Sequence, residues 1–294
     1  MLEPAESRFD IAKRDIEDYF ERSDIKIFRH SDLSRIFKEN KDFWRLGGKA
    51  KIGDFIEDLL STTKLKKTTF RFPSRGETRY QWGNASLYSV LGSINSEAYM
   101  SHYSAASFHG FTEQVPKTLY LNVEQAPSPR RSGKLSQESV DTAFRRKVRV
   151  SSNTIKYRNY TICLLNCMGT DYIGVQQVET DTGEVVRVSG IERTLLDISV
   201  RPVYSGGVHE VLKAYREAKD RFSADKLSSY LKQMDFIYPY HQVIGFYMEK
   251  AGGYSDSQIG IFEELEMPVD FYLTHAMLAT EYSPRWKLFH PVGM

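Results

Sequence analysis

A basic β-hairpin is the feature that most restricts how this chain can fold. Residues 64–82 read KLKKTTFRFPSRGETRYQW, with two alternating arms around the turn residues 73–77. Because strand side chains alternate between two faces, this pattern predicts an aromatic face and a polar face. The aromatic face would hold Phe70, Phe72, Tyr80 and Trp82, and the polar face Lys67, Thr69, Arg71, Arg79 and Gln81. A two-stranded hairpin is at best marginally stable alone, so other elements must cover its aromatic face.

Three helical patterns precede the hairpin and can provide that cover. Apolar residues recur at helical spacing in residues 10–21, in residues 32–40 and, most regularly, in residues 50–61. Ser31 is a candidate N-cap for the second helix. Helices followed by a charged hairpin predict a winged helix-turn-helix domain.

Such a domain would bring specific basic residues to DNA. In helix-turn-helix docking, the N-terminal part of the second motif helix enters the major groove, and here that part is residues 49–51. The acidic residues Asp54, Glu57 and Asp58 further along the helix would repel phosphate. We therefore expect contacts from the start of this helix and from the hairpin. The predicted set is Arg45, Lys49, Lys51, Lys64, Lys66, Lys67, Arg71, Arg75 and Arg79.

The distribution of charge supports this interpretation better than its total. A formal net charge of +2 is too small to mark the whole chain as a nucleic-acid binder. Residues 26–83, however, hold fourteen Lys and Arg against seven Asp and Glu, so the rest of the chain is net negative. Clustered positive charge is the footprint of a nucleic-acid surface. The alternatives are a winged-helix scaffold that serves protein contacts, or a charged face that is simply solvated.

Length and composition predict two domains in an intracellular protein. The 294 residues suit a boundary near residue 95, with a DNA-binding domain in 1–95 and a second domain in 96–294. No run of about 18 apolar residues is present, so we expect a cytoplasmic protein with no membrane partner. Cys163 and Cys167 lie four residues apart in a predicted strand, too far for a disulfide, and are expected to be core thiols.

The second domain is predicted to begin with a sheet and to continue with helices. Strand composition occurs in residues 118–124, 154–166, 172–180 and 183–189, with a turn at 181–183 joining the last two. The pattern is helical from Ile191 to about Gly253. The predicted fold class is therefore α+β, with a winged helix-turn-helix followed by a larger mixed α/β domain.

Two further segments allow a functional and a structural interpretation. Residues 125–134 form a basic loop that could be a second nucleic-acid contact or a mobile surface loop. The basic residues in and after it are Arg130, Arg131, Arg145, Arg146, Lys147 and Arg149. His102 and His109 lie seven residues apart between a candidate N-cap, Ser101, and a candidate C-cap, Gly110. We expect His109 to be a packed histidine at the helix end.

A helix after Gly190 is the most distinctive part of the second domain. In residues 191–198 the spacing predicts that Ile191, Leu195 and Ile198 are buried and that Arg193 pairs with Asp197. A catalytic role for Glu192 or Asp197 would need a nucleophile, a base or a metal partner, and no recognised spacing supplies one. We therefore expect no enzymatic activity, no cofactor and no metal site.

Four segments of the chain together resemble a known family, the AbiEi-type antitoxins of type IV toxin–antitoxin and abortive-infection phage-defence systems. Residues 99–116 look like its Y-x-S-x-x-S-A-L-x-x-H-G-L-x-D-Q-x-P segment. Residues 192–197 are similar to its E-R-T-L-L-D helix, Ser205-Gly206-Gly207 to the following turn, and residues 245–249 to its G-Y-L-L-E helix.

The resemblance implies a repressor that is also an antitoxin. Its N-terminal winged helix would bind double-stranded DNA at its own operon promoter, and its C-terminal domain would oppose a nucleotidyltransferase toxin encoded beside it. His109, Glu192, Arg193 and Asp197 would then be motif residues of the antitoxin domain. Two other hypotheses stay open: an antitoxin that masks its toxin by direct contact without significant DNA binding, and an enzyme that acts on nucleic acid through Glu192 or Asp197.

Overall fold

Residues 7–73, 75–126 and 135–294 are described by the computed structural model. They divide into two units, Met1–Ser96 and Glu97–Met294, one residue beyond the predicted boundary. The fold class is α+β, as predicted, and each unit has its own hydrophobic core. In the part of the chain that the structure describes, no helix combines the length and apolar character needed to cross a membrane.

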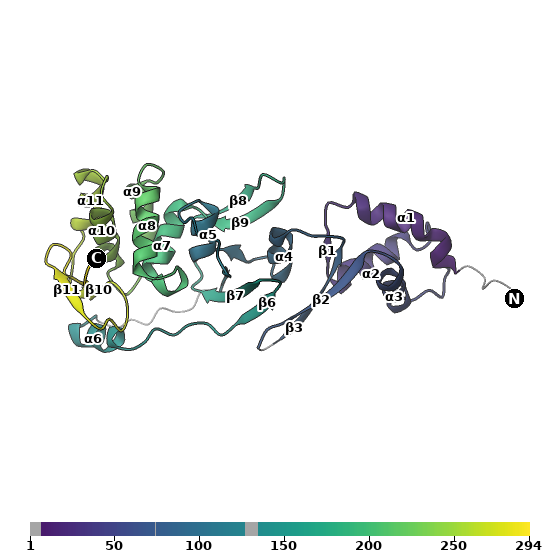
Figure 1. Cartoon of the computed structure of the whole chain (residues 1–294), viewed down its shortest axis with the longest axis horizontal. Coiled ribbons are helices and arrows are strands. Elements are labelled where there is room, and N and C mark those ends of the chain that lie inside the picture. Colours follow the sequence, from purple (N-terminus) through teal and green to yellow (C-terminus); the bar gives the residue numbers. More distant parts are fainter. Residues whose placement is uncertain (1–6, 74, 127–134) are drawn as a thin grey trace. The chain divides into compact units, whose positions relative to one another are not determined.

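The N-terminal unit has the winged-helix order of elements (Figure 1). These are α1 (Arg8–Arg22), β1 (Ile27–Phe28), α2 (His30–Asn40), α3 (Ile52–Thr62), β2 (Leu65–Arg71), β3 (Gly76–Trp82) and α4 (Leu87–Ile94). The strands form a sheet in the order β1-β3-β2. The sequence pattern did not predict β1, because a strand of two residues is too short to show alternation.

Local capping explains where the helices begin, and it corrects one prediction. At α1, the Ser7 hydroxyl accepts from the Asp10 N–H, and the Asp10 carboxylate accepts from the Ser7 N–H, which is a complete capping box. At α2, the cap residue is Arg29, whose N–H donates to the Asp32 carboxylate at 2.7 Å. Ser31 therefore lies inside α2, and its predicted role as N-cap was wrong.

The hairpin register differs from the predicted one. The strands end at Arg71 and begin again at Gly76, so four residues connect them where the sequence pattern suggested five. This changes the cross-strand pairs by an odd number of residues, which moves a strand's side chains to the opposite face. Trp82 now lies opposite Leu65, whereas Phe70 lies opposite Glu77. Phe70 consequently shares a face with Arg79 and not with the aromatic residues of β3.

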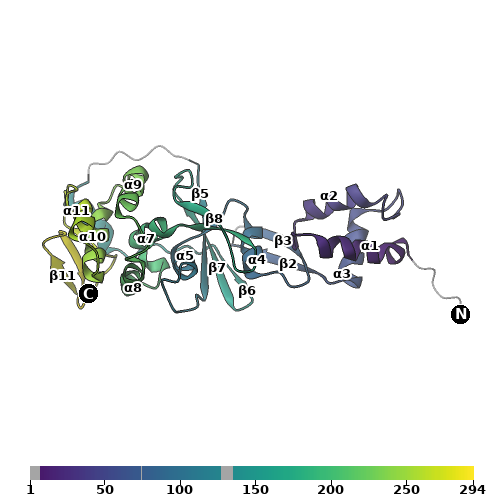
Figure 2. The ribbon, with the colours of Figure 1, turned by 90° about the horizontal axis from the view of Figure 1, so that it is seen from above.

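The face that carries Tyr80 and Trp82 packs on the helices. Trp82 stacks on Phe20 of α1, with ring centroids 4.8 Å apart, and Leu65 and Tyr80 are buried in the same core. Figure 2 shows α1, α2 and α3 gathered together within this unit. The predicted role of the helices as cover for the hairpin's aromatic face is thus confirmed for the β3 residues.

The C-terminal unit begins with a six-stranded sheet in the order β6-β7-β5-β4-β9-β8. Its elements are β4 (Tyr99–Met100), α5 (His102–Phe108), β5 (Thr118–Glu124), α6 (Gln137–Arg145), β6 (Thr154–Tyr157), β7 (Tyr160–Cys167), β8 (Val175–Glu179) and β9 (Val185–Ser189). The turn predicted at residues 181–183 joins β8 and β9 and is confirmed. Residues 154–166, predicted as one strand, instead form a hairpin that reverses at Arg158, where φ is 51°.

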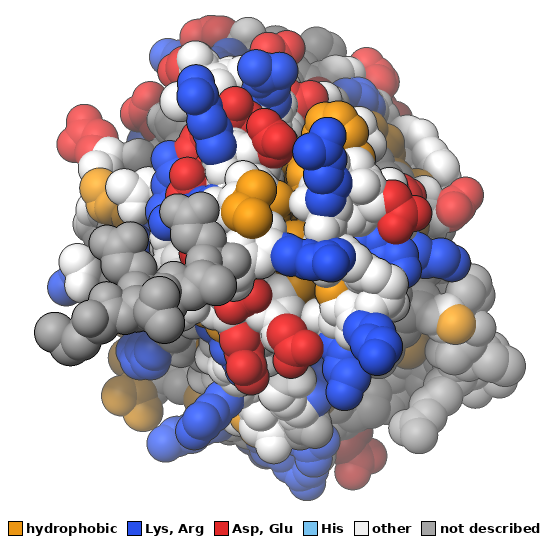
Figure 3. Space-filling view, turned by 90° about the vertical axis from the view of Figure 1, so that its right-hand side faces the viewer, with side chains coloured by type: hydrophobic (Ala, Val, Ile, Leu, Met, Phe, Trp, Pro, Cys, Tyr) orange, Lys and Arg blue, Asp and Glu red, His pale blue; other side chains and the backbone are white. Residues whose placement is uncertain are grey.

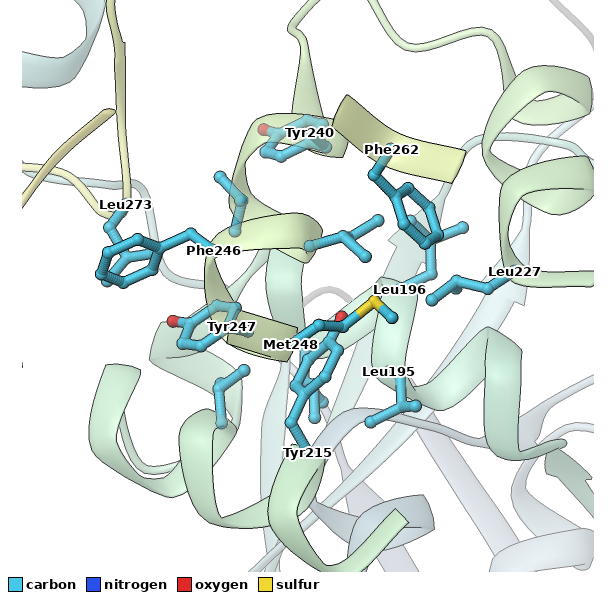
Figure 4. Close-up of a cluster of buried hydrophobic side chains, with 14 of the residues drawn as sticks. Leu195, Leu196, Tyr215, Leu227, Tyr240, Phe246, Tyr247, Met248, Phe262 and Leu273 are labelled. Carbon is cyan, nitrogen blue, oxygen red and sulfur yellow. The ribbon is translucent and has the colours of Figure 1, made fainter. Parts of the chain in front are cut away.

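Helices follow the sheet, as predicted. They are α7 (Ile191–Val200), the 3₁₀ turn η1 (Pro202–Tyr204), α8 (Val208–Ala218), α9 (Ala224–Met234), α10 (Tyr240–Ala251) and α11 (Asp256–Glu263). Their apolar faces form one core that includes Leu195, Tyr215, Phe246 and Phe262 (Figure 4). A small sheet completes the unit with β10 (Phe271–Tyr272), β11 (Thr280–Ser283) and β12 (Leu288–Pro291), which the sequence pattern did not predict, nor did it predict α6.

Residues 245–249 of α10 pack against the side chain of Trp286. A Cβ atom built on Gly245 would lie 2.1 Å from the ring of Trp286, which is fully buried. Four residues later, the Glu249 carboxylate accepts a hydrogen bond from Trp286 Nε1 at 2.6 Å. Gly245 therefore leaves space for the Trp286 ring, and Glu249, one helical turn later, accepts the hydrogen bond from its indole N–H.

We expect Gly245→Ala to destabilise the protein by about 1–3 kcal/mol, because a methyl group would overpack the Trp286 site. Alanine's better helix propensity, worth about 1 kcal/mol, offsets only part of that cost. Urea denaturation followed by circular dichroism measures the change. Gly260→Ala on α11 is the matched control, since nothing lies within 4 Å of its added methyl group, and it should not lower the midpoint. Equal midpoints for the two variants would contradict this account of Gly245.

Candidate nucleic-acid interface and polar cavity

Three basic residues of β2 are the most available cations of the hairpin. Lys66, Lys67 and Arg71 are exposed, and none of them pairs with a carboxylate among the residues that the structure describes. Lys67 and Arg71 share one face of the strand, whereas Lys66 lies on the other. The hairpin of β2 and β3, which we call the wing, thus carries positive charge on both of its faces.

Other predicted contacts are partly engaged within the protein. Lys64 forms an ion pair with Glu21, and its ammonium group lies over the Trp82 ring, 5.9 Å from the centroid. Arg75 pairs with Glu77 at 2.9 Å. Both basic side chains are about half exposed, so these are surface pairs of small energy that a phosphate could replace.

The basic residues before α3 lie in a loop and not in the helix. The helix begins at Ile52, Lys51 is its N-cap and Lys49 precedes it, whereas both lysines were predicted to belong to the helix tip. Arg45 is exposed and adopts a left-handed backbone conformation, with φ of 53°. All three side chains remain exposed, and Lys49 and Lys51 closely precede the N-terminus of α3, where the helix dipole also favours an anion.

Arg79 does not belong to the DNA-contact set, which corrects the prediction. Its side chain is 6% exposed, and its guanidinium donates to the carbonyls of Ser93 at 2.8 Å and Ile94 at 3.1 Å, at the end of α4. The same group pairs with Glu77 at 2.5 Å. Arg79 therefore satisfies carbonyl groups that a helix end leaves without partners, and it holds α4 to β3.

Acidic residues limit the basic surface. Asp54 and Glu57 are exposed on α3, and burial together with Asp10 and Asp54 raises the pKa of Asp58. Figure 3 shows Lys and Arg side chains interspersed with Asp and Glu over the face that it displays. The basic residues of the wing and of the loop before α3 therefore lie on a surface of mixed charge.

In the C-terminal unit, Arg193 is the centre of a buried polar network. It is 1% exposed, and its guanidinium donates to Asp197 at 2.9 Å, to the Tyr99 hydroxyl at 3.0 Å and to the Ile173 carbonyl at 2.6 Å. The predicted Arg193–Asp197 pair is thus confirmed. Burial opposes the charge of Arg193, but Asp197 together with Tyr99 and Cys167 outweighs burial, so the pKa of the guanidinium is raised. The network joins β4, α7 and the segment before β8.

Glu192, the neighbouring motif residue, has a separate structural role. Its carboxylate accepts from the Ser223 N–H at 3.1 Å and from Lys226 Nζ at 2.9 Å, which anchors the start of α9 to α7. Burial alone would raise its pKa, but the hydrogen bonds from Lys226 and from backbone N–H groups, together with the charge of Lys226, outweigh burial and lower it. Glu192 therefore stays ionised and pairs with a cation.

His102, at the start of α5, and His109, its C-cap residue, contact different elements. His109 Nε2 lies 2.7 Å from the Ser189 carbonyl, and burial lowers the pKa of the ring, so we assign it as a neutral donor. His102 is buried and packs edge-on against Tyr204, with ring centroids 5.4 Å apart. Within the described ranges, no group of three His, Cys, Asp or Glu side chains could hold a metal ion.

A cavity of about 450 Å³, lined by both polar and apolar side chains, lies beside the Arg193 network. Its lining includes His102, Asn122, Arg149, Asp197 and Arg201, together with apolar residues of β7 and α9. No sequence pattern indicated this cavity, because its residues come from β5, β7, α7 and loops that are distant in sequence. Burial raises the pKa of Cys167, which also lines the cavity, to about 11, so it is a neutral thiol.

The predicted second basic segment is only partly described. Arg130 and Arg131 lie outside the described residues, whereas Arg145, Arg146, Lys147 and Arg149 are exposed. Of these four, Arg149 lines the cavity.

Comparisons with known proteins show the fold and no family. No family model matches the chain, and no curated protein matches it. Among solved structures, it is similar to the crystal structure of the RV2827C protein from Mycobacterium tuberculosis, with a TM-score of 0.63 and 14% sequence identity. The match covers 97% of this chain and 93% of that chain. At this identity, the likeness establishes a shared architecture through both units.

Removing Arg79 should loosen the hairpin from α4. We expect Arg79→Met to increase hydrogen exchange in β3 and α4, because Glu77 Oε2 and two helix-end carbonyls lose the donor that Arg79 provides, at a cost of about 2–4 kcal/mol. Mass spectrometry of peptides that cover residues 76–94 measures the effect. Arg71→Met, an exposed change on the paired strand, is the control and should leave exchange unchanged. The structural role of Arg79 is wrong if both variants exchange alike.

Burial of His102 should make the protein less stable in acid. Burial lowers the pKa of this ring to about 4, from about 6.5 in an unfolded chain. Between these values the unfolded state binds the proton more readily, so the free energy of unfolding should fall as pH decreases from about 6.5 towards 4. His102→Asn removes the ring and suits the φ of 49° at this position.

We therefore expect this variant to lose less stability than the wild type between pH 7.5 and pH 5, as measured by urea denaturation. His241, whose pKa burial also lowers to about 4, should account for part of the remaining slope. His209→Asn, on the exposed side of α8, should behave as the wild type does. An unchanged slope in His102→Asn would show that this ring is not the source.

Proposed function

We propose that this protein is a DNA-binding transcriptional autorepressor and the antitoxin of a toxin–antitoxin operon. The observation that carries the proposal is a winged-helix unit whose wing strand β2 presents Lys66, Lys67 and Arg71 without carboxylate partners among the described residues. Cations that no internal acid neutralises remain available to release counterions from DNA phosphates. The partner we propose is double-stranded DNA at the protein's own promoter, with inverted repeats.

Two surfaces of the N-terminal unit would contact the duplex. The loop with Arg45, Lys49 and Lys51 would lie at the backbone beside the major groove, next to the N-terminus of α3. The wing would reach phosphates or the minor groove beside it. Asp54 and Glu57 keep the remainder of α3 away from phosphate, so α3 would approach the groove with its tip.

The C-terminal unit would serve as the antitoxin domain, without catalysis. Glu192 joins α7 to α9 through Lys226, Arg193 and Asp197 form an ion pair within α7, and His109 at the end of α5 contacts the Ser189 carbonyl at the end of β9. In this proposal these residues shape the domain, and the surface that opposes the nucleotidyltransferase toxin lies elsewhere. The resemblance of the sequence to AbiEi-type antitoxins supports this assignment.

The mixed charge of the N-terminal unit favours a second candidate function. A protein-interaction antitoxin would mask its toxin directly and would not need a continuous basic face, in keeping with the acidic residues on α3. Copurification of the toxin with this protein, together with no detectable promoter binding, would favour this candidate. Promoter binding by the purified protein would favour the repressor.

The wing variant Lys66→Ala/Lys67→Ala/Arg71→Ala should bind promoter DNA more weakly and with a weaker salt dependence. Each phosphate contact that the variant removes should reduce the slope of log K against log salt by about 0.9. Fluorescence anisotropy at several salt concentrations measures both quantities.

A charge-matched control separates the wing from general electrostatics. Arg216→Ala/Lys219→Ala/Lys232→Ala removes three exposed cations from α8, the turn after it and α9. This control should bind DNA nearly as the wild type does. If the wing variant also keeps the wild-type affinity and slope, the wing is not a DNA contact.

A further inference from the structure

The cavity beside Arg193 contains buried acceptors that lack a donor. Asp197 uses Oδ1 for Arg193, whereas its Oδ2 has no hydrogen-bond partner among the described residues. Oδ1 of Asn122 is in the same situation. Asp197 is 7% exposed and Asn122 is 1% exposed, and both line the cavity. A buried polar atom without a partner costs free energy, so a ligand that donates hydrogen bonds to these two oxygens would gain affinity from them.

Two exposed cations also line the same cavity. Arg149 and Arg201 line it and are exposed, and neither pairs with a carboxylate in the described part of the chain. Guanidinium groups bind phosphate and carboxylate through two parallel hydrogen bonds. The exposed part of the cavity is therefore suited to an anionic group.

Apolar side chains form the remaining wall. Leu165, Val200 and Phe236 line the cavity, and Tyr204 adds an aromatic ring that is 8% exposed. The volume of about 450 Å³ falls within the range of sites for small organic molecules, about 300–1,000 Å³. Apolar walls, a few convergent polar atoms and a charged opening are the usual composition of such sites.

We propose that this cavity is a binding site for a nucleoside monophosphate. The phosphate would contact Arg149 and Arg201, the base would lie against the apolar wall, and amino or hydroxyl groups would donate to Asp197 Oδ2 and Asn122 Oδ1. A dianionic phosphate matches two guanidinium groups better than a single carboxylate does. A bare anion would leave the two inner acceptors without donors, and an uncharged nucleoside would leave the two arginines unused.

Isothermal titration calorimetry of the full chain tests the site. The probes are AMP, GMP, CMP and UMP, with the matching nucleoside and ribose 5-phosphate as incomplete ligands. We expect at least one nucleoside monophosphate to bind with a Kd below about 100 µM, and at least tenfold more tightly than either incomplete ligand. Arg149→Ala/Arg201→Ala should weaken this binding tenfold or more. Arg145→Ala/Arg146→Ala removes two exposed cations that do not line the cavity, and it should not weaken binding.

Several outcomes would overturn the proposal. One is a Kd above about 1 mM for all four nucleotides, and another is equal binding by the two double variants. Ribose 5-phosphate that binds as tightly as the nucleotide would show an anion site without base recognition. Because these measurements use no DNA and no toxin, their outcome is independent of the proposed repressor function.

Discussion

The C-terminal unit depends on the hydrogen bonds that the buried guanidinium group of Arg193 donates. It hydrogen-bonds to Tyr99 at the start of the sheet, to the Ile173 carbonyl before β8 and to Asp197 one turn further along α7. Removing one partner from a buried ion pair typically costs about 3–5 kcal/mol, because the other charge stays desolvated. The sheet and the helices that follow it are thus joined through a polar centre, and the cavity opens beside that centre.

Arg79 has a comparable role in the N-terminal unit. It lies on the strand that was expected to contact DNA, yet it donates to two carbonyls at the end of α4 and pairs with Glu77. Both arginines show that a basic residue in a motif can be structural when acceptors surround it. The cations available for an external anion are instead those without internal acids, such as Lys67 and Arg71.

Periodicity predicted the elements whose signal is local. The helix patterns of residues 10–21 and 50–61, the strand at 118–124 and the turn at 181–183 all follow from spacing within one segment. The hairpin register could not be obtained in this way, because a connection of four or five residues decides it and both fit the composition. The cavity was equally inaccessible, since tertiary packing brings Asn122, Asp197 and Arg201 together from separate segments.

Four residues in segments 192–197 and 245–249 have structural roles. Gly245 leaves space for the Trp286 ring, and Glu249 accepts a hydrogen bond from its indole N–H. Glu192 binds Lys226 of α9, and Arg193 links α7 to Tyr99 of the sheet. The side chains of Glu249, Glu192 and Arg193 are committed to internal partners, so a ligand could recruit them only at the cost of the fold. Asp197 differs, because one of its oxygens serves the framework and the other has no partner among the described residues. A ligand that donates to this second oxygen would gain a hydrogen bond without breaking the Arg193–Asp197 ion pair. The cavity could therefore bind a small molecule while the contacts that hold the fold together stay in place.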